Sequence, residues 1–321
     1  MHSVLAFKAS SRRICSNWRR LAKLALCLCA TRTYLIHVSG GISDLRDAVA
    51  HCNSFTSQVT SQLYEDDSTG VWDLLSEVDH TFILSFTGCR TKVPGRYAHK
   101  STCIIGKEID ACAPKPYLRG NYVHAMKVTF AHAVVIQLAT DAGFRHIAIF
   151  EDDITLVGRN MSLTVRDNFR TLISSKNNWS FVRLGFRPYF LQKNADAHCP
   201  TKCRCQITHY GDHLCRLKAS GCDIRSSDLY VVNSLYFKKF QQRLTDLRMK
   251  NTKRIVDLHP LRSFSHQWLL IPQISYQRVS DLPPDYQLGT GALFITKCVQ
   301  PRPLPARLVT SSILVQQTSD S

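Results

Sequence analysis

The chain has 321 residues, of which 44% are hydrophobic, and a formal net charge of +17. This length and apolar content suffice for a buried core, so they exclude a disordered or fibrous protein and fit one large α/β domain. The positive charge suits phosphorylated small molecules, anionic membranes or polyanions, but it is equally typical of a solvated surface and selects no partner by itself.

Residues 1–32 have the features of a targeting segment or a weak anchor. They contain many Lys and Arg side chains, and no acidic residue precedes Asp44. The apolar run at residues 24–30 is far shorter than the roughly 18 residues that span a bilayer. We therefore expect this segment to lead the chain into the endoplasmic reticulum or Golgi lumen, with at most a weak membrane association. A cytoplasmic location is the alternative.

Strands and helices alternate through the first part of the chain. β-branched, aromatic and apolar runs predict strands at residues 33–38, 81–86, 147–150 and 181–184. Apolar residues spaced by three and four predict helices at residues 121–142 and 162–174. Residues 90–120 lack such a period and are expected to form a long irregular loop. The alternation predicts a mostly parallel central sheet with ligands at the carboxyl ends of its strands.

The alternation stops beyond Arg187, where residues 188–222 form a cysteine-rich stretch. We expect this stretch to be an insertion that is separable from the rest of the fold. Strands are predicted again at residues 230–232 and 268–276, and a helix at residues 234–247. The main domain is thus expected to span residues 33–298, followed by a poorly ordered tail at residues 299–321.

The chain contains 13 cysteines, which is many for a reducing compartment. Two interpretations of the cysteine-rich stretch remain open: disulfides, which secretion favours, or a tetrahedral zinc site. The available side chains are Cys199, Cys203, Cys205, Cys215, His198, His209 and His213. Their spacing is not that of a recognised zinc finger. In a secretory lumen, the triplets that begin at Asn160 and Asn178 would accept glycans.

Three consecutive carboxylates, Glu151, Asp152 and Asp153, follow the apolar strand at residues 147–150. Like charges placed together oppose ionisation unless a cation neutralises them, and oxygen ligands suit Mg²⁺ or Mn²⁺. In an extended chain, Glu151 and Asp153 would point to one side and Asp152 to the other. We therefore predict Asp153 as the first metal ligand and Glu151 as the second. An acidic loop that caps the next helix is the alternative.

The segment before this triplet resembles glycosyltransferase family 25, which includes bacterial lipopolysaccharide glycosyltransferases and collagen galactosyltransferases. The family pattern is a Ser-His pair on a helix, a Gly-containing turn and an apolar strand that ends in Glu-Asp-Asp. Here Ala131 and His132 lie on the predicted helix, Gly143 lies in the turn, and the triplet ends the strand. Similar segments follow the family order over residues 33–278, at residues 34–38 with Arg46, 179–185, 230–233, 256–257 and 271–273.

The resemblance implies a GT-A (Rossmann-like) fold and transfer of a sugar, with inversion, from a nucleotide diphosphate-sugar to an acceptor hydroxyl. We expect a UDP-sugar donor and a glycan, lipopolysaccharide-like or protein acceptor, and no nucleic acid. Asp257, which matches a family position, and His259 are candidates for the base that takes the proton from the acceptor. A turn-forming role is the alternative for Asp257.

The expected donor site contains His132, Arg46, Arg119, Glu151 and Asp152. The arginines would contact the diphosphate, but each is equally explained as a surface charge, and His132 is equally explained as a core histidine.

Two other functions remain open. Ala131 and His37 replace a Ser and an Asn of the family pattern, which leaves a degenerate, non-catalytic binding module as one alternative. A metal-dependent nuclease or phosphodiesterase is the other, because an acidic metal site in a basic protein suits a polyanionic substrate. The sequence lacks the several separated Asp and His ligands that are typical of such enzymes.

Overall fold

The structure, a computed structural model, describes residues 56–59, 61–62, 69–113, 123–156, 161–176, 179–225, 228–246, 260–271, 273–277 and 284–300. Residues 1–32, the predicted strand at residues 33–38 and the chain after residue 300 lie outside these ranges. So do four of the candidate site residues: Arg46, Arg119, Asp257 and His259.

The fold is α/β and contains a 10-stranded sheet. Its strands are β1 (Thr56–Gln58), β3 (His80–Ser85), β5 (Ser101–Ile105), β6 (His146–Glu151), β8 (Phe181–Arg183), β10 (Cys205–Thr208), β11 (Gly211–Leu217), β13 (Leu229–Asn233), β14 (Gln267–Leu270) and β16 (Val299–Gln300). They lie in the order β1-β5-β3-β6-β13-β8-β14-β11-β10-β16. Short strands pair outside this sheet: β2 (Ser61–Gln62) with β4 (Val93–Pro94), β7 (Ile154–Leu156) with β15 (Ser275–Gln277), and β9 (Arg187–Pro188) with β12 (Ile224–Arg225).

The sheet is mixed, so the expectation of a mostly parallel sheet is wrong. Neighbours run parallel at β5–β3, β3–β6, β8–β14 and β10–β16. They run antiparallel where β13 lies between β6 and β8, where β11 lies between β14 and β10, and at β1–β5. Sheets of this kind are common in large α/β folds. In the parallel unit β5-β3-β6, the carboxyl ends of three strands lie side by side.

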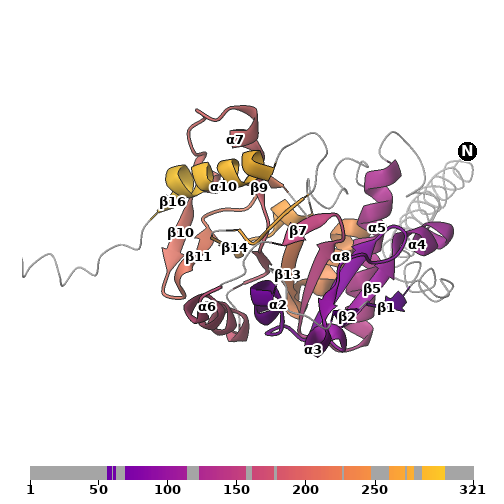
Figure 1. Ribbon diagram of the computed structural model, residues 1–321. Coiled ribbons are helices and arrows are strands. Elements are labelled where there is room, and N and C mark those ends of the chain that lie inside the picture. The colour runs from indigo at the N-terminus through magenta and orange to yellow at the C-terminus, as the bar shows by residue number, and fades with distance from the viewer. Residues whose placement is uncertain are drawn as a thin grey trace, which may run out of the picture. The chain divides into compact units, whose positions relative to one another are not determined.

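Helices cover both faces of the sheet (Figure 1). The helices are α2 (Thr69–Leu75), α3 (Gly95–Ala98), α4 (Gly106–Cys112), α5 (Val123–Asp141), α6 (Leu163–Ser174), α7 (Tyr189–Lys193), α8 (Phe237–Thr245) and α10 (Pro284–Cys298), with 3-10 turns η2 (Thr201–Cys203), η3 (Ser234–Tyr236) and η4 (Leu261–Ser263). Side chains alternate along each strand, so neighbouring residues meet different layers. Phe150 and Val231 pack in one core with α2 and α6, whereas Phe181 and Tyr230 contact Phe240 of α8.

Charged side chains join the end of helix α2 to helix α6. Glu77, just after α2, accepts hydrogen bonds from Arg166 and Arg170 of α6. These two arginines lower the pKa of Glu77, with Arg170 having the larger effect, although burial of the carboxylate opposes them.

Helix α5 is long and apolar enough to cross a membrane by length and composition, but most of its side chains are buried within the fold.

Most regular elements agree with the sequence predictions. The strands at residues 81–86, 147–150, 181–184 and 230–232 are confirmed as β3, β6, β8 and β13, and the helices at residues 121–142 and 162–174 as α5 and α6. The prediction of a helix at residues 234–247 corresponds to η3 followed by α8, and that of a strand at residues 268–276 to β14 and β15. The prediction of an irregular loop at residues 90–120 is wrong, because this stretch contains β5, whose Cys103 and Ile104 are fully buried.

The cysteine-rich stretch is part of the main sheet, contrary to the expectation of a separable insertion. Strand β11 pairs with β14, and Cys215 lies opposite Leu269. Disulfides join Cys205 to Cys215, Cys203 to Cys222 and Cys199 to Cys298. The disulfide interpretation is therefore confirmed, and these cysteines are not available to zinc. With Cys89–Cys103 there are four disulfides among the described residues, which is consistent with an oxidising compartment such as the secretory pathway.

The disulfides differ in the length of chain that each one closes. Cys199 and Cys298 are 99 residues apart, whereas Cys205 and Cys215 are 10 apart. The chain-entropy model therefore predicts that replacing the first pair by alanine lowers the free energy of unfolding by about 2 kcal/mol more than replacing the second. Urea unfolding of the two double variants measures this difference. An equal loss in both would contradict the entropic origin of the stabilisation.

Candidate functional site

A cavity of about 580 Å³ lies where the parallel strands β5, β3 and β6 end. Residues 84–87 of the β3 exit form one wall, and Lys127, Val128 and Ala131 of α5 form another. The acidic triplet lines the cavity from the end of β6. The carboxyl ends of parallel strands are the edge where open α/β sheets bind ligands. The cavity is therefore the candidate site.

The triplet leaves β6 in a turn and not as an extended chain. Strand β6 ends at Glu151, and β7 begins at Ile154. The alternation on which the orientation of Asp153 was predicted therefore stops at Glu151. Even so, all three carboxylates line the cavity. The Glu151 side chain is 18% exposed, and Asp153 is exposed.

The carboxylate of Asp152 binds the loop that follows β3. Its Oδ2 accepts a hydrogen bond from the backbone N–H of Arg90 at 2.7 Å, and its Oδ1 accepts one from the backbone N–H of Thr91 at 2.8 Å. The Thr91 hydroxyl also donates to Oδ1, and the backbone N–H of Asp152 donates to the carbonyl of Leu84 at 2.8 Å. These bonds tie the exits of β3 and β6 together. Asp152 therefore shapes the wall of the cavity, in addition to lining it.

The side chain of His132 is fully buried and lies behind Glu151. Its Nδ1 is 2.6 Å from the Tyr230 hydroxyl, and its Nε2 is 3.5 Å from Oε1 of Glu151, at the limit of hydrogen-bond distance. Because the Glu151 carboxylate only accepts, a neutral imidazole would carry its hydrogen on Nε2 and accept the Tyr230 hydroxyl at Nδ1. The arrangement supports Glu151 from behind, and the predicted contact of His132 with the donor stays a prediction.

The structure also brings together residues that the sequence analysis did not select. Arg90 and Lys127 line the cavity, and Nζ of Lys127 lies 2.7 Å from Oδ2 of Asp110. Phe86 lies at the cavity with 58% of its surface exposed. The signal for Lys127 is its spacing of four residues from Ala131, which places both on one face of α5. The apolar residues dominate the pattern of this helix, so the pattern by itself does not point to Lys127.

The described side chains do not by themselves form a complete metal site. Among the residues that the structure describes, no group of three or more His, Cys, Asp and Glu side chains is arranged to hold a metal ion. Arg46, Arg119, Asp257 and His259 lie outside the described residues, so their predicted roles stay predictions.

Comparisons with known proteins add no family assignment. No protein-family model matches the chain, and a search of curated proteins found no matching relative. The resemblance to glycosyltransferase family 25 therefore depends on the sequence segments quoted above.

Asp152→Asn tests the structural role of the triplet. The amide nitrogen cannot accept a hydrogen bond, so one of the two backbone donors loses its partner. A hydrogen bond to a charged group contributes about 1.5–3 kcal/mol, so we expect a loss of about 2 kcal/mol in urea unfolding and faster amide exchange at Arg90 and Thr91.

Asp153→Asn is the matched control, because Asp153 is exposed and we expect its replacement to change stability little. Equal stability of the Asp152 and Asp153 variants, with unchanged exchange at Arg90 and Thr91, would show that the loop does not depend on Asp152.

Proposed function

We propose that the protein is a metal-dependent glycosyltransferase with a GT-A-like fold that transfers a sugar, with inversion, from a nucleotide diphosphate-sugar to an acceptor hydroxyl. The observation that carries this proposal is the acidic triplet in the cavity at the exits of β5, β3 and β6. Ligand pockets are typically about 300–1,000 Å³, and this cavity falls within that range. A UDP-sugar is the proposed donor, on the family resemblance.

The triplet suits a divalent cation that the substrate helps to bind. Mg²⁺ and Mn²⁺ are usually held by one or two carboxylates together with water and substrate phosphates. Glu151 and Asp153 are the proposed ligands, since the two oxygens of Asp152 accept backbone hydrogen bonds from the neighbouring loop. When bound, such an ion would offset the negative charge that develops on the departing diphosphate.

Other side chains of the cavity supply the remaining contacts. Lys127 and Arg90 are cations on its walls and are proposed to pair with the diphosphate. Phe86 would present its ring to a base or a sugar. Aromatic rings bury large areas against such flat ligands.

The family resemblance supplies the rest of the proposal. Asp257, or alternatively His259, is proposed to take the proton from the acceptor hydroxyl. The four disulfides support a place in the lumen of the endoplasmic reticulum or Golgi. The proposed acceptor is a glycan, a lipopolysaccharide-like molecule or a protein.

One observation favours a second candidate, a binding module that has lost catalysis. Ala131 lines the cavity at the position where the family pattern has a serine. Such a module would still bind a nucleotide-sugar with Mn²⁺ but would release no nucleoside diphosphate.

A donor screen tests the proposal. Release of nucleoside diphosphate is measured from a panel of nucleotide-sugars with and without Mn²⁺, and we expect metal-dependent release from a UDP-sugar. Asp153→Asn should lower turnover at least ~100-fold, because loss of metal stabilisation costs several kcal/mol and about 1.4 kcal/mol is tenfold in rate.

Asp196→Asn is the control: Asp196 is an exposed residue of the cysteine-rich stretch, so the substitution removes the same charge away from the cavity and should keep full turnover. An Asp153→Asn variant that retains most of its metal-dependent turnover would disprove the ligand assignment. Metal-dependent binding of a nucleotide-sugar without release would instead support the binding module.

A further inference from the structure

A second group of charged side chains, distinct from the acidic triplet, lies on the paired strands β9 and β12. Arg187 of β9 lies directly opposite Arg225 of β12. Like charges in this position destabilise a strand pair. Both side chains are nevertheless partly withdrawn from solvent, with exposed fractions of 18% and 30%. Arg262, 22% exposed, adds a third guanidinium to the group.

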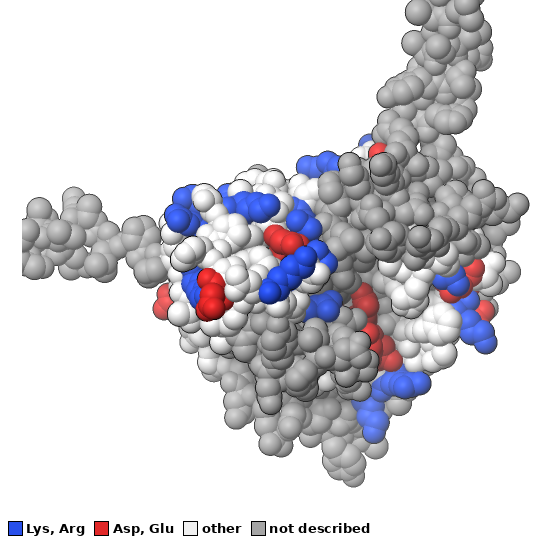
Figure 2. Space-filling view, turned by 90° about the horizontal axis from the view of Figure 1, so that it is seen from above, with Lys and Arg blue, Asp and Glu red and all other residues white. Residues whose placement is uncertain are grey.

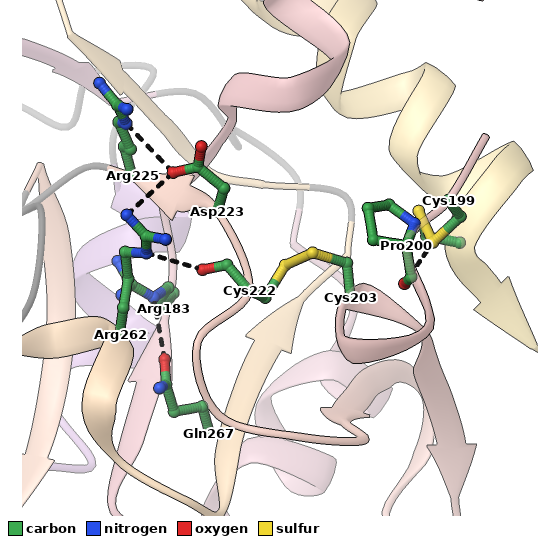
Figure 3. The surroundings of a disulfide bond; sticks show 10 residues. Arg183, Cys199, Pro200, Cys203, Cys222, Asp223, Arg225, Arg262 and Gln267 are labelled. Carbon is green, nitrogen blue, oxygen red and sulfur yellow. Dashed lines mark hydrogen bonds and ion pairs between the residues drawn. A yellow bond between two sulfur atoms is a disulfide. The ribbon is translucent and has the colours of Figure 1, made fainter. Parts of the chain in front are cut away.

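Two of the arginines, Arg225 and Arg262, are held by contacts with neighbouring groups. Oδ1 of Asp223 lies 3.2 Å from Nε of Arg225 and 3.1 Å from Nη1 of Arg262, so one carboxylate joins two guanidinium groups (Figure 3). Arg262 also donates from Nε to the carbonyl of Cys222 at 3.0 Å. Cys222 is in a disulfide with Cys203, immediately before Asp223. The backbone that carries the cluster is therefore covalently anchored.

Arg225 is also stacked on an aromatic ring. Its guanidinium carbon lies 3.4 Å from the centroid of the Tyr189 ring, and Nζ of Lys193 lies 4.8 Å from the same centroid. A stacked guanidinium loses less freedom when it binds an anion, because its orientation is already restricted.

Positive charge exceeds negative charge in this cluster. Its cations are Arg187, Arg225, Arg262 and Lys193, and its carboxylates are Asp223 and Asp228. Lys and Arg side chains also lie over the region of α7 and α10 in the view from above, with acidic side chains between some of them (Figure 2). The cluster therefore favours an anionic ligand.

The position of the cluster relates it to the candidate site. The backbone N–H of Glu151 donates to the carbonyl of Asp228 at 3.2 Å, and the buried carboxylate of Asp228 lies 3.5 Å from Nη2 of Arg187. Strand β8, which leads to β9, lies beyond β13 in the sheet order, whereas β3 and β5 lie on the other side of β6. The cavity and the arginine cluster thus flank the triplet on opposite sides.

We propose that Arg187, Arg225 and Arg262, with Tyr189, form a binding site for an anionic saccharide, whose carboxylate or sulfate they hold. The identification of this saccharide as the acceptor, approaching the triplet from the β8 side, rests on the proposed function. Anion binding by the cluster does not depend on it.

Calorimetric titration of the full chain tests the site without donor or metal. The probes are a heparin-derived disaccharide, which carries sulfate and uronate, and lactose as its neutral counterpart. We expect binding of the charged disaccharide alone, weakened at least tenfold by Arg225→Gln and less by Arg225→Lys, which keeps the charge. The thermal midpoint of each variant is measured alongside. Arg187 is left unchanged, because its loss would leave the carboxylate of Asp228 buried without this partner.

Lys238→Gln is the matched control, since it removes one exposed charge on α8. Equal weakening by Lys238→Gln and Arg225→Gln, or no binding of the charged disaccharide to the unaltered protein, would overturn the proposal. If the disaccharide binds through Arg225 but no nucleotide-sugar releases its diphosphate, the anion site stands and the proposed transferase function fails.

Discussion

The carboxylate of Asp152 accepts hydrogen bonds from the backbone of Arg90 and Thr91, and much of the candidate site depends on this contact. Three adjacent carboxylates repel one another, and the backbone dipoles that face Asp152 offset part of that repulsion. The same bonds hold the β3 exit beside the β6 exit and turn the chain between β6 and β7. The cavity wall and the turn that carries Asp153 both depend on this interaction.

Buried residues also support Glu151 from two sides. Tyr230 and His132 form a buried polar pair behind Glu151, on the face of the sheet covered by α5 and α8. On the other side of the triplet, the carbonyl of Asp228 accepts from the backbone of Glu151, while its carboxylate faces Arg187. A transferase must place two substrates at one reacting centre, and this edge of the sheet offers a cavity on one side and an arginine cluster on the other. The geometry therefore accommodates both halves of the proposed reaction.

Local sequence patterns predicted the elements that pack directly against the core, such as β6 and α5. The apolar run of β6 and the spacing in α5 were sufficient, because each element packs against the core along its whole length. Strand β5 was missed because its polar residues and the surrounding Gly, Pro and Lys conceal the fully buried Cys103 and Ile104, the first of them in a disulfide with Cys89. The direction of β13 and the pairing of β11 with β14 depend on partners far away in the chain, which no local period encodes. The turn at Asp152 was missed for the same reason, since its partners are about 60 residues earlier.

The central claim is that Glu151 and Asp153 bind a divalent ion that substrate phosphates help to hold. Mn²⁺ binding measured by electron paramagnetic resonance, with and without UDP, tests it most directly. Two carboxylates alone hold such an ion weakly, so we expect Mn²⁺ to be mostly free at micromolar protein and to become bound when UDP is added. The bound fraction should fall in Asp153→Asn. Binding of Mn²⁺ that is equally tight without UDP, or that persists unchanged in Asp153→Asn, would contradict the account.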